Sequence, residues 1–281
     1  MEGKICLITG ANSGIGKETA KELARMGAQV VMVCRNKEKG ESVRSEIINE
    51  IGNSKIDLLL CDLSYPDQIR NLATKFRTKY RKLHVLINNA GVMLSNRMMT
   101  KEGIEMNFAV NYLAPFLLTC SLLDVLKESA PSRIINISSA AHRMAMLDFE
   151  DLQCENIKYK LFKVYGKSKL ALMLFTYELS RRLEGTGVTA NAIHPGLVNT
   201  NLGRDQSKFS QWFAKLFFKS PLKGAETSIY LASSPDVEGI TGKYWIKKEQ
   251  RDSSENSYNE EDAKKLWNMT AKITGEDCNI S

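Results

Sequence analysis

The chain has 281 residues, of which 43% are hydrophobic and 25% are charged, and its formal net charge is +7. This composition can bury a large core and excludes general disorder. The 39 Lys and Arg residues are interleaved with 32 acidic residues. The sequence has no basic block of the kind found in nucleic-acid-binding arms, so we expect no nucleic acid partner.

Short apolar runs alternate with helical patterns over the first 200 residues. The runs are typical of strands buried on both faces, at Ile5–Ile8, Val30–Val33, Ile56–Leu60, Val85–Ile87, Ile134–Ile137 and Val188–Ile193. Helix-length segments lie between them, at Lys17–Met26, Lys37–Glu50, Asp67–Tyr80, Glu105–Glu128 and Val164–Glu184. The alternation predicts an α/β fold with one Rossmann-type, doubly wound parallel sheet and helices on both faces.

We expect one domain over residues 1–281, because no linker or composition break divides the chain. A charged C-terminal tail covers about 247–281, with a loop at Lys247–Glu261 and a last helix at Asp262–Ile273. No apolar stretch reaches the ~18–20 residues of a membrane span. The six cysteines form no metal-like cluster, and three of them lie in or just after buried strands as small hydrophobes. We therefore expect no metal site and a reducing, cytoplasmic location, with peripheral membrane association left open.

A glycine-rich turn follows the first predicted strand and precedes a helix. Gly10 allows the sharp turn, Gly14 lets the backbone approach a pyrophosphate, and Gly16 lets the helix and strand pack closely. The helix N-terminus then offers N–H groups to phosphates. This context predicts a dinucleotide cradle made of Gly10, Asn12, Ser13, Gly14, Ile15 and Gly16.

The spacing Gly-x-x-x-Gly-x-Gly resembles that of the short-chain dehydrogenase/reductase family. The second strand ends at Cys34-Arg35-Asn36, without the acid that accepts ribose hydroxyls in NAD-specific folds. Arg35 can bind a 2′-phosphate through its planar guanidinium. We therefore predict NADP(H), with Arg35 and Asn36 at the adenosine end. The family resemblance implies further cofactor contacts from Asp62, Leu63, Asn89, Ala90, Gly91, Pro195, Gly196, Val198 and Thr200.

Tyr165 and Lys169 lie four residues apart in a predicted helix, so both side chains can face one cleft. A tyrosine with a pKa near 10 is a poor base at neutral pH, and a nearby cation is expected to lower that pKa. The resemblance implies that Ser139 holds the substrate oxygen, with Ser138 as the alternative. It also implies that Asn111 orders a water beside Lys169, and that Lys169 binds the nicotinamide ribose.

The three histidines receive no catalytic role, because Tyr165 and Lys169 already supply the acid. His194 is interpreted as structural. His142 is a candidate for lining the substrate entrance, and His84 is left without a role.

The 26 positions from Ser139 to Tyr165 are more than short family members have. This insert, with the Gly3–Thr274 resemblance, is most similar to the retinol dehydrogenase branch, which reduces retinal and other apolar aldehydes with NADPH. The segment at about 203–224 is interpreted as a substrate lid, since it carries an apolar stripe of Phe209, Trp212, Phe213, Leu216 and Phe217. An interfacial helix that touches a membrane and simple core packing are the two alternatives.

These features predict NADPH-dependent, reversible reduction of an apolar aldehyde or ketone, with retinal among the candidates. A reductase of a large ring substrate, similar to protochlorophyllide reductases, is one alternative. A non-enzymatic NADP(H)-sensing protein is the other. The expected partner is a small apolar carbonyl or alcohol, and a homodimer is left open.

Overall fold

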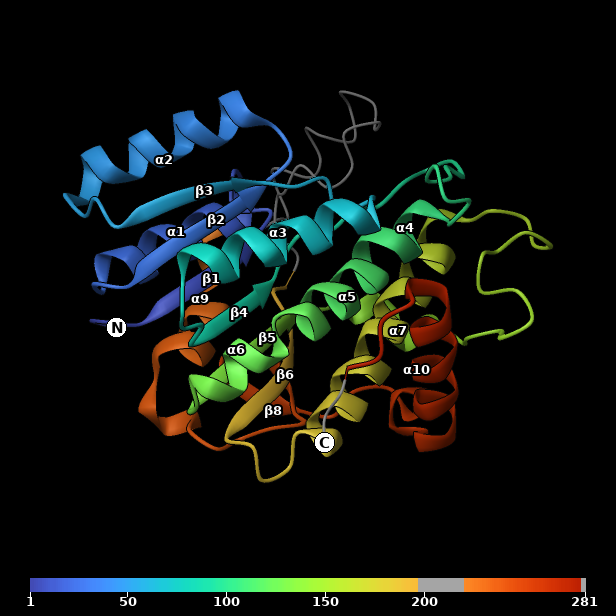
Figure 1. Cartoon of the computed structure of the whole chain (residues 1–281). Helices are drawn as coiled ribbons and strands as arrows, with labels where there is room; N and C mark the ends of the chain where they lie inside the picture. Colours follow the sequence, from blue (N-terminus) through green and yellow to red (C-terminus); the bar gives the residue numbers. More distant parts are fainter. Residues whose placement is uncertain (197–219, 279–281) are drawn as a thin grey trace.

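A computed structural model describes residues 1–196 and 220–278 and contains one mostly parallel sheet (Figure 1). In that part of the chain the strand order is β3-β2-β1-β4-β5-β6-β7-β8, and only the β7–β8 pair is antiparallel. The order reverses between β1 and β4, which in such sheets creates a crevice beyond the strand ends. The strands are β1 (Ile5–Thr9), β2 (Gln29–Cys34), β3 (Ile56–Leu60), β4 (Val85–Asn88), β5 (Ser132–Ile137), β6 (Val188–His194), β7 (Tyr244–Ile246) and β8 (Glu249–Arg251).

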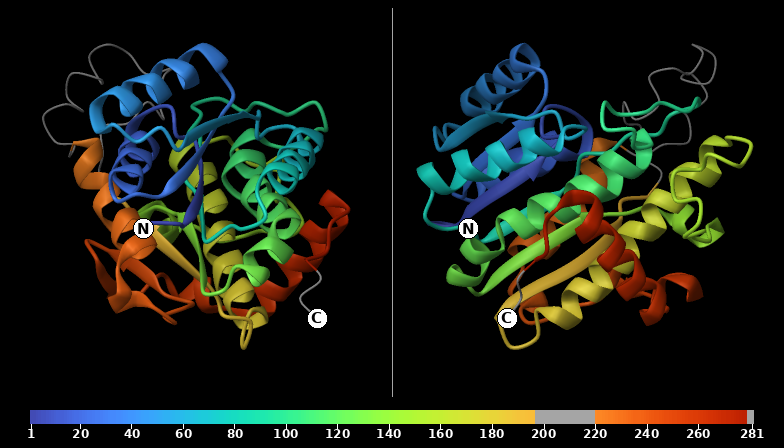
Figure 2. Two further views of the ribbon diagram at one scale, coloured as in Figure 1. Left: turned by 60° about the vertical axis from the view of Figure 1, so that its left-hand side comes forward. Right: turned by 45° about the vertical axis from the view of Figure 1, so that its right-hand side comes forward.

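Helices cover both faces of the sheet, because successive strand residues point to opposite sides. Leu7 and Leu86 pack against α3, α5 and α7, whereas Cys6 and Ile8 pack against α1, α2 and α9. Helix α10 lies against α7 on the outside of its layer (Figure 2). The α-helices are α1 (Gly14–Arg25), α2 (Lys37–Ile51), α3 (Pro66–Lys79), α4 (Met106–Phe108), α5 (Ala114–Ser121), α6 (Leu123–Glu128), α7 (Leu161–Arg182), α9 (Pro221–Ser233) and α10 (Glu260–Thr274). None of the helices at 1–196 and 220–278 is both long and apolar enough to cross a membrane.

The doubly wound parallel sheet is confirmed, and three details of the sequence prediction are wrong. The single helix at Glu105–Glu128 is instead α4, a π-helical turn at Ala109–Leu113, α5 and α6. Residues 221–224 of the expected lid belong to α9, which packs on α1. The expected loop at Lys247–Glu261 contains β8 and a 3₁₀ turn at Glu255–Tyr258.

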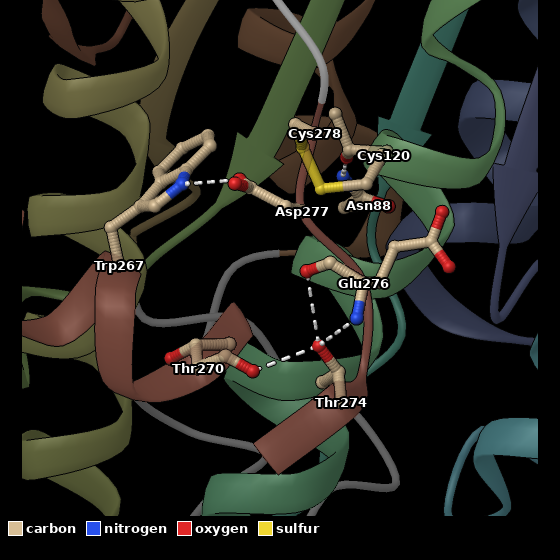
Figure 3. The surroundings of a disulfide bond; sticks show 9 residues. Asn88, Cys120, Trp267, Thr270, Thr274, Glu276, Asp277 and Cys278 are labelled. Atoms are coloured by element: carbon tan, nitrogen blue, oxygen red, sulfur yellow. Dashed lines mark hydrogen bonds between the residues drawn. A yellow bond between two sulfur atoms is a disulfide. The ribbon is translucent and has the colours of Figure 1, made fainter. Parts of the chain in front are cut away.

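The C-terminal segment after α10 is tied back to the core (Figure 3). Helix α10 is capped by Gly275, whose φ of 63° lies in the left-handed region. Cys278 then forms a disulfide with Cys120 of α5 across 158 residues. The other four cysteines are buried free thiols. The expectation that all six cysteines are reduced is therefore wrong for Cys120 and Cys278, whose separation of 158 residues left no pattern of pairing in the sequence.

Candidate active site

The glycine-rich turn joins β1 to α1 with little room for side chains. A Cβ on Gly16 would lie 2.4 Å from the Asn89 Nδ2 atom and 2.5 Å from the Gly10 carbonyl oxygen. Ser13 precedes α1, yet its side chain makes no capping hydrogen bond, and the first turn of α1 holds no acid. The positive end of α1 is therefore suited to bind phosphate.

Thr9 and Asn89 join the ends of β1 and β4 at the reversal point. The Thr9 hydroxyl accepts hydrogen bonds from the backbone N–H groups of Asn89 and Ala90, both at 3.0 Å. The Asn89 Nδ2 atom donates to the Thr9 carbonyl oxygen at 2.7 Å. Thr9 was missed from the sequence, although its position directly before Gly10 could have marked it. These bonds hold the turn against the segment that carries Asn89 and Ala90.

The next two strand ends carry the residues predicted to bind adenosine. Arg35 is exposed directly after β2. The Asn36 side chain caps α2 by accepting from the Lys39 N–H at 2.8 Å, and its carbonyl oxygen accepts from the Gly40 N–H at 3.0 Å and from the Cys34 thiol at 3.2 Å. The Asp62 carboxylate accepts from Ser64 N at 3.0 Å and from Ser64 Oγ at 2.7 Å. The start of α1 has no side-chain cap and no acidic residue, and the Arg35 side chain is exposed. Both features fit a phosphorylated dinucleotide.

Ser139, Tyr165 and Lys169 are brought together by β5 and α7. Tyr165 and Ser139 are hydrogen-bonded through their side chains. The Lys169 Nζ atom lies 5.7 Å from the centroid of the Tyr165 ring and donates to the Ile137 carbonyl oxygen at 2.8 Å. Ser138, the alternative serine, instead donates to the Lys169 carbonyl oxygen at 3.4 Å and is buried. Of the two serines, Ser139 thus contacts the tyrosine.

Burial sets the protonation of this pair. Desolvation raises the pKa of Tyr165 to about 12, opposed by the hydrogen bond with Ser139. Desolvation also lowers the pKa of Lys169 to about 7. The expected lowering of the tyrosine pKa is therefore wrong for the protein groups alone, because desolvation raises the pKa of Tyr165 and only the hydrogen bond with Ser139 opposes it.

Asn111 lies in the π-helical turn and is fully buried. Its side-chain amide bonds Val92 through both atoms, at 2.8 and 2.9 Å, and donates to Ser168 Oγ at 3.0 Å. Ser168 Oγ in turn donates to the Tyr165 carbonyl oxygen at 2.7 Å. Asn111 is thus connected through Ser168 to the backbone of Tyr165. Its proposed role beside Lys169 stays a prediction.

Two histidines and a glycine support the turn that follows β5. The Ala140 N–H donates to His194 Nδ1 at 3.3 Å, a structural role of the kind expected for His194. His142 is fully buried, so its expected position at the substrate entrance is wrong. Gly166 lets this turn approach α7, because a Cβ there would lie 2.7 Å from the Ala141 carbonyl oxygen.

Some predicted site residues lie outside the described part of the chain. Pro195 and Gly196 follow β6 and are partly buried. Val198, Thr200 and the apolar stripe from Phe209 to Phe217 lie outside the described residues. The lid prediction at 203–219 is therefore untested.

The parallel sheet, the cradle and the Ser139–Tyr165–Lys169 group define a dinucleotide-dependent oxidoreductase architecture. The model of the short chain dehydrogenase family matches residues 4–211, and the chain belongs to this family. It is 46% identical to retinol dehydrogenase 12 of Mus musculus, covering 97% of this chain and 87% of that protein. The chain is therefore a retinol dehydrogenase-like member of the family.

Solved structures agree with this assignment. A putative uncharacterized protein from Mycobacterium paratuberculosis matches with a TM-score of 0.81 and 30% identity, covering 98% of this chain and 95% of that one. The Pseudomonas aeruginosa RhlG/NADP active-site complex matches with a TM-score of 0.70 and 25% identity, covering 87% of this chain and 94% of that one.

Proposed function

We propose that this protein catalyses the NADPH-dependent, reversible reduction of apolar aldehydes and ketones, with retinal among the candidate substrates. The observation that carries the proposal is the junction of β5 and α7, where Tyr165 bonds Ser139 and Lys169 lies over the Tyr165 ring. When bound, NADPH supplies the hydride for the carbonyl carbon. The protein side chains then have to orient the carbonyl oxygen and give it a proton.

Each side chain has a distinct task in this scheme. The Ser139 hydroxyl holds the substrate oxygen beside the Tyr165 phenol, which donates the proton. Lys169 is buried, and its amino group can bond the nicotinamide ribose and, when protonated, stabilise a phenolate. Arg35 and the start of α1 bind the 2′-phosphate and the pyrophosphate.

The raised pKa of Tyr165 predicts how the rates of carbonyl reduction and alcohol oxidation depend on pH. A phenol with a pKa of about 12 is protonated at neutral pH, which is the form that reduces a carbonyl, whereas alcohol oxidation needs the phenolate. We expect kcat/KM for oxidation to rise from neutral into alkaline pH, and kcat/KM for reduction not to rise. Profiles of both directions for one substrate pair measure this. An oxidation profile that is flat over that range would contradict the assignment of Tyr165.

Arg35 is expected to determine the preference for NADPH over NADH. Arg35→Asp removes the cation that would bind the 2′-phosphate and adds a repelling carboxylate. Hydrogen bonds to charged groups contribute roughly 1.5–3 kcal/mol, so we expect the ratio of kcat/KM for NADPH over NADH to fall about 10- to 100-fold. Lys55→Asp makes the same charge change at an exposed site before β3 and should leave the ratio unaltered. An unchanged ratio in Arg35→Asp would sink the NADP(H) assignment.

An apolar substrate is supported by exposed side chains near Tyr165. Phe162 is 64% exposed and lies three residues before Tyr165 on α7, so the two share a helix face. Met144 and Met146 are each 72% exposed, and Ala145 between them lies next to Gly166 of α7. Large exposed apolar side chains gathered at one place are typical of a ligand or interaction site.

A further inference from the structure

His142 lies one turn beyond Ser139, in the 3₁₀ turn Ala140–Met144. Its imidazole is fully buried and packs edge-on against the Tyr244 ring, with 5.1 Å between the ring centroids. A buried imidazole that takes no part in the proposed proton transfer needs another explanation.

Both ring nitrogens of His142 are hydrogen-bonded to backbone. Nε2 accepts from the Ser254 N–H at 3.1 Å, and because an N–H can only donate, Nε2 carries no proton. The proton therefore sits on Nδ1, which donates to the Ser139 carbonyl oxygen at 2.6 Å. Burial lowers the pKa of His142; the hydrogen bond with Ser139 opposes this and the charge of Arg143 adds to it. The net lowering of the pKa keeps the ring in this neutral form.

The segment that holds Nε2 is itself fixed to the core. The Ser253 hydroxyl is bonded to the Tyr177 hydroxyl of α7 at 2.7 Å. Asn256 Nδ2 donates to the Ala145 carbonyl oxygen at 3.1 Å, and Arg143 donates to the Ser253 and Asp252 carbonyl oxygens. His142 therefore connects the peptide unit of Ser139 to an anchored part of the chain more than a hundred residues away.

We propose that His142 is a positioning residue that holds the backbone of Ser139 so that its hydroxyl meets Tyr165. The inference rests on the proposed function, in which Ser139 orients the substrate oxygen. Ser139 is extended, with φ −155° and ψ 151°, and its carbonyl oxygen is bonded both to His142 Nδ1 at 2.6 Å and to the His142 backbone N–H at 3.2 Å. Loss of the shorter of these two bonds loosens the peptide, and a displacement of about 1 Å near reacting groups can cost about 100-fold in rate.

Two amide substitutions separate the two bonds of the imidazole. In His142→Asn the amide nitrogen is as many bonds from Cα as Nδ1 and can still donate to the Ser139 carbonyl oxygen. In His142→Gln the amide oxygen is as many bonds from Cα as Nε2 and can still accept from Ser254. We expect kcat for carbonyl reduction to fall about 10- to 100-fold in His142→Gln and by a much smaller factor in His142→Asn, with the NADPH Kd unchanged in both. Equal kcat values for the two variants would overturn the proposal.

A double-mutant cycle with Ser139→Ala distinguishes positioning from general destabilisation. If His142 acts through Ser139, the loss caused by His142→Gln should disappear when Ser139 is already alanine. The same fold-loss in both backgrounds would contradict the proposal.

The same variants distinguish failure of the proposed catalytic role of Ser139 from failure of the positioning role of His142. Ser139→Ala with wild-type turnover would overturn the role of Ser139 and, with it, that of His142. A strong loss in Ser139→Ala combined with equal activity of the two His142 variants would overturn the positioning role alone.

Discussion

Replacement of Tyr165 by phenylalanine is expected to lower kcat for carbonyl reduction by about 10²–10⁴-fold, the usual contribution of a positioned acid. The substitution removes only the hydroxyl that bonds Ser139, and the ring stays beneath Lys169. The NADPH Kd should therefore change little, because the glycine-rich turn and Arg35 are untouched. Steady-state kinetics and a fluorescence titration with NADPH measure the two quantities.

Tyr80→Phe is a matched control away from the site. Tyr80 is buried and its hydroxyl bonds the Asp57 carboxylate, so its loss should cost about 1.5–3 kcal/mol of stability and leave kcat within a few-fold of the wild type. Tyr165→Phe with near wild-type turnover, or an equal loss in both variants, would remove Tyr165 from the mechanism.

Gly16→Ala is expected to weaken NADPH binding and to destabilise the fold. The added Cβ would lie 2.4 Å from Asn89 Nδ2 and 2.5 Å from the Gly10 carbonyl oxygen, so the start of α1 has to move away from β4. Such overpacking costs about 1–3 kcal/mol, and the displaced N–H groups no longer face the pyrophosphate together. Thermal denaturation with and without NADPH should show a lower Tm and a smaller rise on adding the cofactor.

Gly52→Ala makes the same chemical change where it cannot reach the cradle. Gly52 ends α2 with φ 70° and has nothing within 4 Å of an added Cβ, so the substitution strains the backbone and touches no neighbour. Its Tm should fall, while the rise on adding NADPH should match that of the wild type. If both variants kept the full cofactor-induced rise, the cradle assignment would be wrong.

The sheet could be predicted because its strands are continuous apolar runs, each followed by a polar or glycine-rich turn. The same regularity placed the Gly10–Gly16 turn and Ser139 at strand ends, whereas the prediction for Tyr165 came from its spacing to Lys169 and from the family resemblance. The interruption of the predicted helix at Asn111 was harder to predict. Pro115 lies inside that helix and lacks the N–H group that would form a helical hydrogen bond.

Other features were missed for separate physical reasons. Helix α9 carried a usable signal, with Ser220 as its cap and Pro221 in its first turn, but these residues fell inside the segment interpreted as a lid. The bond from Ser254 to His142 spans 112 residues, and the disulfide spans 158. Pairings of this kind depend on the folded path of the chain and leave no local pattern.

The most direct test of the proposed function is NADPH consumption by the purified protein with a series of apolar aldehydes of graded size, including retinal, read together with formation of the matching alcohol. We predict stoichiometric alcohol formation, faster with NADPH than with NADH, favouring large apolar aldehydes over small polar ones, and strongly reduced in Tyr165→Phe. Tight NADPH binding without alcohol formation from any aldehyde or ketone would contradict the proposed reaction.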